Sequence, residues 1–254
     1  MGLFDLFRSK KLPPGDPVTQ KAGMRLINKN ADLDTRFHAA QTLGEIGTEE
    51  AIYCLLQRFT VTIGGGIPDE DEKTFAYDQI LKFGRKSIPP IVRFLKDKEF
   101  AAKPLQLLDS LTTSEEYVDI LLDVIATFDV FYSKFPDKKI QVFKKIGEFN
   151  DSRILDTITP FLEDDDDDVR IAVVNAIAAQ NNEEATRELL LELIIQSAER
   201  PRVRLAACEA LATKEWKVKG FRKRIADALP DRFYLDAKGH ILRRSGTEIL
   251  LDNP

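Results

Sequence analysis

The chain has 254 residues, 43% of them hydrophobic and 31% charged, which provides apolar material for one sizeable core or a row of small ones. The formal net charge of -5 at pH 7 argues against a surface that contacts phosphate backbones along its whole length. Cys54 and Cys208 are the only cysteines and form no Cys-x-x-Cys pair, so neither a disulfide framework nor a structural zinc site is indicated. With no apolar run of about 18 residues and no signal-peptide pattern, we expect a cytoplasmic protein.

The first segment, residues 1–16, places bulky apolar residues before Arg8, Lys10 and Lys11, and Pro13 then ends any helix. We expect a flexible or amphipathic leader, either loose or folded back on the rest of the chain. Membrane contact, or insertion into a groove of a partner, is an alternative for residues 1–11 and for no other part of the sequence.

Residues 17–230 repeat one pattern, in which a small or apolar residue is followed by apolar residues four and, in most units, seven positions later. This spacing marks one face of a helix. It falls on Ala39/Leu43/Ile46, Ala76/Ile80/Phe83, Pro104/Leu108/Leu111, Val142/Ile146/Phe149, Val173/Ile177 and Ala207/Leu211. A second apolar stripe follows in the first five units, within residues 52–59, 88–95, 118–125, 154–161 and 189–194. The pattern predicts an all-α fold, a right-handed α-solenoid of about six helix pairs.

The ends of the helices and of the repeat have signals of their own. Thr48, Ser114 and Asn182 each precede two glutamates, which predicts that they cap the second helices of their pairs. An opening helix is expected at about residues 17–30 and a closing helix at about 218–229. Residues 231–254 are expected to form a short β-hairpin, with strands at 232–235 and 240–244, followed by a tail.

The segments that begin at Asp34-x-Arg36 and Asp168-Val169-Arg170, each followed by paired small or β-branched residues, resemble HEAT repeats. They are most similar to the short bacterial units called PBS-lyase HEAT-like repeats, and the resemblance covers about residues 30–230. It implies a ladder of Asp and Arg side chains inside the stack. The matching positions hold Arg36, Arg170 and Arg204, whereas Lys73, Lys139 and Ala101 depart from the pattern. We therefore expect the ladder to break at those three units.

Two segments invite an interpretation as ligand sites. The acidic run Glu163–Asp168 lacks the Gly and Glu of an EF-hand, because Val169 and Asn175 occupy those positions, so we expect a solvated turn with Asp168 as a helix cap. Binding of a divalent cation or a basic partner is the alternative. The stretch from Thr60 to Glu72 contains Gly64, Gly65 and Gly66 but no P-loop motif, and is expected to be a lengthened loop on the rim of the solenoid.

Charge is distributed unevenly along the second half of the sequence. Residues 148–192 carry a net charge of -10, and residues 200–244 carry a net charge of +8. The basic end can steer an acidic partner, RNA or an anionic surface, or it can consist of solvated helix faces.

The sequence offers few residues for acid–base or nucleophilic catalysis. His38 and His240 are the only histidines, and neither cysteine has a histidine near it in sequence. We predict no catalytic residue, cofactor or metal, and expect a monomeric, non-enzymatic scaffold or adaptor that binds an unidentified protein through its concave second-helix face. The predicted contact residues are Arg58, Gly64, Gly65, Gly66, Arg93 and Lys96, with Arg222, Lys223 and Arg224 at the basic end.

Two alternatives stay open. A phycobilin-lyase-like or other enzyme-maturation factor would hold a protein substrate in the same groove. Nucleic-acid binding through the basic C-terminal end is weaker, because the acidic midsection opposes contact with phosphates.

Overall fold

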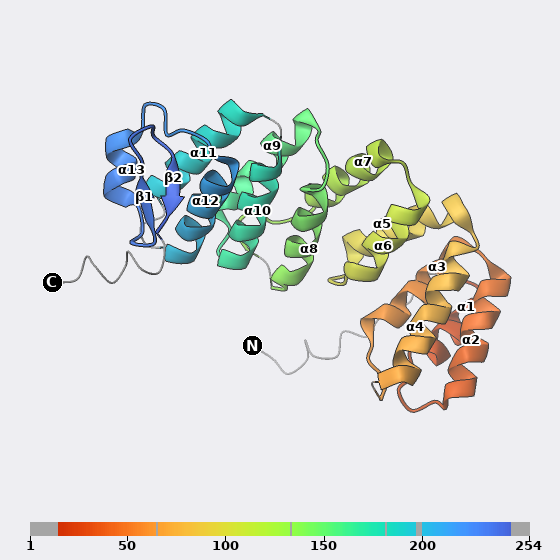
Figure 1. The fold of residues 1–254 in the computed structure, drawn as a ribbon. Coiled ribbons are helices and arrows are strands. Elements are labelled where there is room, and N and C mark those ends of the chain that lie inside the picture. The colour runs from red at the N-terminus through yellow and green to blue at the C-terminus, as the bar shows by residue number, and fades with distance from the viewer. Residues whose placement is uncertain (1–14, 65, 133, 181, 197–199, 245–254) are drawn as a thin grey trace. The chain divides into compact units, whose positions relative to one another are not determined.

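The computed structural model describes residues 15–64, 66–132, 134–180, 182–196 and 200–244 (Figure 1). In these ranges the fold consists of helices and one short hairpin, as the repeats predict. The chain divides into two compact units, residues 1–120 (unit 1) and 121–254 (unit 2). Residues 1–14 of the predicted leader lie outside the described residues. The division of the chain into leader, solenoid and hairpin stays a prediction.

Unit 1 is built from helix pairs whose first helices pack in sequence, α2 on α4 and α4 on α6. Its short second helix α3 packs against α1, α2, α4 and α5, so every residue from Ala51 to Leu56 is buried. The elements are α1 (Pro17–Leu26), α2 (Leu33–Ile46), α3 (Glu49–Leu56), η2 (Gln57–Thr60), α4 (Gly66–Leu81), η3 (Gly84–Ser87), α5 (Ile88–Asp97), α6 (Ala102–Leu111) and the first part of α7 (Ser114–Ile125).

Unit 2 repeats this arrangement, with first helices α8, α10 and α12 packed in one row (Figure 1). Its elements are α8 (Pro136–Ile146), α9 (Ser152–Ile158), η4 (Thr159–Glu163), α10 (Asp167–Ala179), α11 (Glu183–Gln196), α12 (Pro201–Lys214), α13 (Arg222–Ala228), β1 (Phe233–Leu235) and β2 (Ile241–Arg243). The antiparallel hairpin, in which Phe233 pairs with Arg243, packs against α12 through β2. The predicted hairpin is therefore confirmed.

Helix caps agree with the sequence in part. The Thr48 hydroxyl accepts a hydrogen bond from the backbone N–H of Ala51 at 3.3 Å, which confirms it as the cap of α3. The prediction that Ser114 caps α7 is wrong by one residue, because the cap is Thr113. The Thr113 hydroxyl accepts from the Glu116 N–H, and the Glu116 carboxylate accepts from the Thr113 N–H, so these two residues form the capping box.

A buried ion network joins the first two helix pairs of unit 1. The Arg36 guanidinium of α2 donates to the Glu72 carboxylate of α4 at 2.7 Å, and Arg58 Nε donates to the same carboxylate at 3.0 Å. Arg58 Nη2 also lies 2.5 Å from Asp69 Oδ1, and Lys73 Nζ lies 2.6 Å from Asp69 Oδ2. Because both carboxylates are almost completely buried, each needs these cations to remain ionised away from water.

This network overturns two expectations about the segment from Thr60 to Glu72. Helix α4 begins at Gly66, so the predicted loop is short and most of the segment is helical. Arg58, predicted to contact a partner, is 0% exposed and also donates to the Val61 carbonyl at 2.8 Å. Burial alone raises the pKa of Asp69, but hydrogen bonds from Arg58, Lys73 and the Ile63 N–H outweigh it and hold the pKa well below its usual value.

Unit 2 has an equivalent buried pair, formed by Lys139 of α8 and Asp164, which precedes α10. Lys139 Nζ lies 2.6 Å from Asp164 Oδ2 and also donates to the carbonyls of Asp129 and Tyr132. The expected break of the ladder at Lys139 is wrong, because lysine makes the contact between pairs there. The expectation of a solvated turn is wrong for Asp164, which is 0% exposed, and the cap of α10 is Asp166 rather than Asp168.

We expect the Arg58→Ala variant to lose about 3–5 kcal/mol of unfolding free energy, because it leaves two buried carboxylates short of a cation. Urea unfolding measures this loss. The matched control is Arg85→Ala, which removes an exposed pair with Glu116 and should cost about 0–1 kcal/mol. Equal losses in the two variants would show that the network does not stabilise the fold as described.

Candidate functional site

The predicted contact residues of unit 1 lie in different environments. Gly64 and Gly66 are exposed, with positive φ angles of 69° and 72° that favour glycine, while Gly65 lies outside the described residues. Arg93 is half-buried and stacks on the ring of Tyr53, with its guanidinium carbon 4.5 Å from the ring centroid. Lys96, one turn further along α5, is also half-buried.

The predicted basic residues of unit 2 occupy the first turn of α13, where Arg222, Lys223 and Arg224 are exposed. Arg222 donates to the carbonyl oxygens of Asp236 and Ala237 and thereby holds the hairpin turn. Arg224 lies over the ring of Phe221. Two of these three side chains therefore already have contacts within unit 2.

Ion pairs within unit 2 also neutralise part of the basic end. Its arginines pair with acidic side chains of the same unit, some of them in the run Glu163–Asp168. These pairs are Arg200 with Asp167, Arg202 with Asp168 and Arg243 with Glu209. The charge asymmetry of the sequence is thus partly compensated inside the fold, which weakens the case for a basic surface that binds nucleic acid.

A groove lies between the second helices α9 and α11 of unit 2. Two adjoining hollows of about 440 and 550 Å³ form it, and they share Leu155, Asp156 and Ala185. The apolar part of the larger hollow, here called the floor, consists of Leu155, Pro160, Ala185 and Leu189. Its acidic part, here called the rim, consists of Asp156, Glu188 and Glu192, all of which are exposed. We call this surface the α9–α11 groove.

Local sequence explains how these side chains reach the groove. Helix α9 begins after Asp151, whose carboxylate accepts from the Arg153 N–H at 2.9 Å. Helix α11 begins after Asn182, whose side-chain oxygen accepts from the Ala185 N–H, as predicted for this cap. Along α11, Glu188 and Glu192 lie one turn apart and therefore project from the same face.

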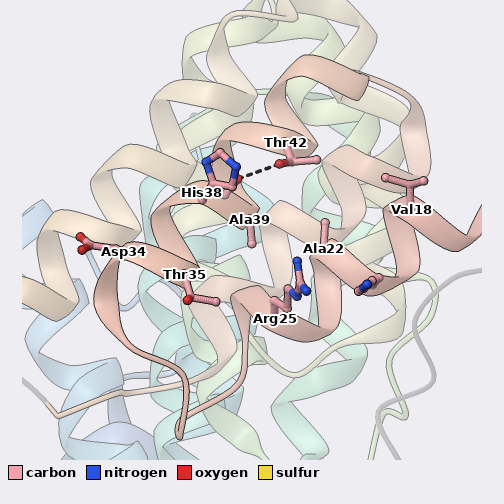
Figure 2. A pocket seen from close by; sticks show the side chains of 9 residues that line it. Val18, Ala22, Arg25, Asp34, Thr35, His38, Ala39 and Thr42 are labelled. Atoms are coloured by element: carbon pink, nitrogen blue, oxygen red, sulfur yellow. Dashed lines mark hydrogen bonds between the residues drawn. The ribbon is translucent and has the colours of Figure 1, made fainter.

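A third hollow, of about 440 Å³, lies between α1 and α2 at the start of unit 1. Figure 2 shows Val18 and Asp34 at opposite ends of it, with Arg25 and His38 between them. The one hydrogen bond drawn in Figure 2 is donated by the Thr42 hydroxyl to the His38 carbonyl at 2.8 Å. His38 is an exposed residue of α2. Within the described residues, the Thr42 hydroxyl is held by the His38 carbonyl rather than by the imidazole.

The two cysteines are interior residues of α3 and α12. Cys54 is 1% exposed and Cys208 is 0% exposed. Burial raises the pKa of the Cys54 thiol to about 11 and that of the Cys208 thiol to about 12. Neither thiol is therefore a reactive nucleophile near neutral pH. Across the described ranges, no group of three or more His, Cys, Asp or Glu side chains is arranged to hold a metal ion.

We expect the folded protein to show no rapid reaction of either thiol with Ellman's reagent near pH 8, because both are buried and protonated. After addition of guanidinium chloride, both thiols should react. A thiol that reacts rapidly in the folded protein would contradict the burial described here.

Sequence reasoning missed the α9–α11 groove. In the sequence its acidic residues belong to a negatively charged segment, and only the fold brings them beside α9. The signal that could have found the groove is the four-residue spacing of Glu184, Glu188 and Glu192, which places three acidic side chains on one face of α11.

Among the described residues, no helix is both long enough and apolar enough to cross a membrane. Comparison with known proteins found neither a matching curated protein nor a matching solved structure. Residues 126–212, which include α8 to α11 and most of α12, match the family model of HEAT repeats. This match supports a HEAT-repeat protein, and the PBS-lyase type stays a prediction.

Proposed function

We propose that this protein is a non-enzymatic scaffold or adaptor that binds a protein partner through the second-helix face of unit 2, at the α9–α11 groove. HEAT repeats commonly mediate protein–protein interaction, and the groove lies within the segment that matches them. Stacked helix pairs provide extended surfaces for such contacts without a catalytic centre.

The observation that carries the proposal is the composition of the groove. Leu155, Pro160 and Leu189 contribute apolar surface, and charged side chains border it. Protein interfaces have this arrangement, with an apolar centre that excludes water and a polar rim around it.

Contact residues predicted in unit 1 are proposed in addition to the binding surface of unit 2. In unit 1, Arg93, Lys96, Gly64 and Gly66 are further contact residues, whereas Arg58 is buried and contacts no partner. We expect the free protein to be a cytoplasmic monomer. Nucleic acid is a weaker candidate, because the rim of the groove repels phosphates.

The test is quantitative affinity capture from a lysate of the source organism with two tryptophan variants. Ala185→Trp fills the groove with a bulky side chain, and Ala226→Trp introduces the same side chain on the exposed face of α13. We expect the first variant to reduce recovery of a specific protein about tenfold, as for a blocked binding hot spot, and the second to leave it unchanged.

Circular dichroism and thermal unfolding establish that both variants are folded before capture. Equal recovery with the wild type and Ala185→Trp would contradict the proposed site, and the absence of any enriched protein would contradict the scaffold function.

A further inference from the structure

The rim of the α9–α11 groove carries negative charge that no cation neutralises among the described residues of unit 2. Within the described part of unit 2, the side-chain carboxylates of Asp156, Glu188 and Glu192 make no hydrogen bond or ion pair. Other acidic residues of the unit do have such partners, among them Asp151 with Arg153, Asp164 with Lys139, Asp167 with Arg200, Asp168 with Arg202, Glu183 with Arg187 and Glu209 with Arg243. The fold therefore leaves negative charge uncompensated at the groove.

Repulsion between acidic side chains lowers the stability of α11. Glu184, Glu188 and Glu192 follow one another at four-residue intervals on α11, and all three are exposed. Like charges at this spacing destabilise a helix. The only arginine of α11, Arg187, pairs with Glu183 instead. A cation supplied from outside the chain would remove this repulsion.

The spacing of the charges indicates the geometry of a suitable partner. Four residues along a helix correspond to about 6 Å, so the three glutamates extend over about 12 Å of α11. Basic residues four positions apart on a second helix have the same spacing and can meet them in register. The floor formed by Leu155, Pro160, Ala185 and Leu189 lies beside this charged row and can receive apolar side chains.

We infer that the α9–α11 groove binds an amphipathic basic helix of another protein, with leucine-like residues on the floor and Lys or Arg residues four positions apart against the acidic rim. The inference rests on the proposed function and specifies its partner. Charge complementarity identifies this occupant, because an acidic peptide or a nucleic acid would add to the repulsion along α11.

The test uses the full chain and a fluorescein-labelled peptide of defined sequence, LKKLLKLLKKLLKL, in fluorescence anisotropy. Two further peptides separate the contributions, one with glutamate in place of every lysine and one with serine in place of every leucine. We expect only the leucine–lysine peptide to bind strongly, and its affinity to fall as the salt concentration rises from about 50 to about 200 mM.

The decisive variant is Asp156→Asn/Glu188→Gln/Glu192→Gln, which removes the charge of the rim but preserves its shape. We expect it to bind the peptide about tenfold more weakly, because each exposed ion pair contributes only a few-fold. The matched control is Asp137→Asn/Asp227→Asn/Asp231→Asn, which removes the same charge from exposed positions of unit 2 outside the groove and should bind like the wild type.

Three outcomes would overturn the inference: equal binding by the rim variant, an equal loss in the control variant, or equal binding of the serine peptide. Sedimentation gives one more such outcome. If the wild type self-associates and the rim variant does not, a second copy of this chain would be the occupant of the groove, and the inference would be overturned. Partner capture that Ala185→Trp blocks but the rim variant leaves intact would uphold the proposed function and refute the basic helix. Capture that neither variant changes would refute both.

Discussion

A buried cation of one helix pair, held by a carboxylate of the next pair, is the interaction on which the stacking in each unit depends. In unit 1 the pair is Arg36 with Glu72, and in unit 2 it is Lys139 with Asp164. Apolar stripes drive helices together but tolerate small shifts between them. A buried ion pair does not, because displacement leaves a charge without its partner in a medium of low polarity. These pairs therefore fix how successive first helices are aligned.

The consequences extend to the surfaces of both units. In unit 1, Arg58 joins the network through Asp69 and Glu72, which explains why the segment after the glycines forms the first turns of α4 rather than a free loop. In unit 2, Asp164 lies directly after η4, which continues α9. The pair with Lys139 thereby sets where this end of the groove lies. The groove is the surface that remains once the first helices are aligned.

Much of this fold could be predicted from the sequence, because a helix period of 3.6 residues is a local property. The apolar stripes placed the helix pairs, and the caps Thr48 and Asn182 placed the starts of two second helices. The burial of Arg58 could not be predicted in this way. A lone arginine after a helix is usually exposed, and only folding brings Asp69 and Glu72 to it. The groove was missed for the same reason, since it depends on two helices about thirty residues apart.

The central claim is that partners bind at the α9–α11 groove, and hydrogen–deuterium exchange of the full chain with and without the leucine–lysine peptide tests it most directly. The account predicts slower exchange in α9 and α11, with α8, α10 and α12 unchanged, because the peptide contacts only the second helices of unit 2. Slower exchange confined to α13 or to unit 1, with α9 and α11 unchanged, would contradict it.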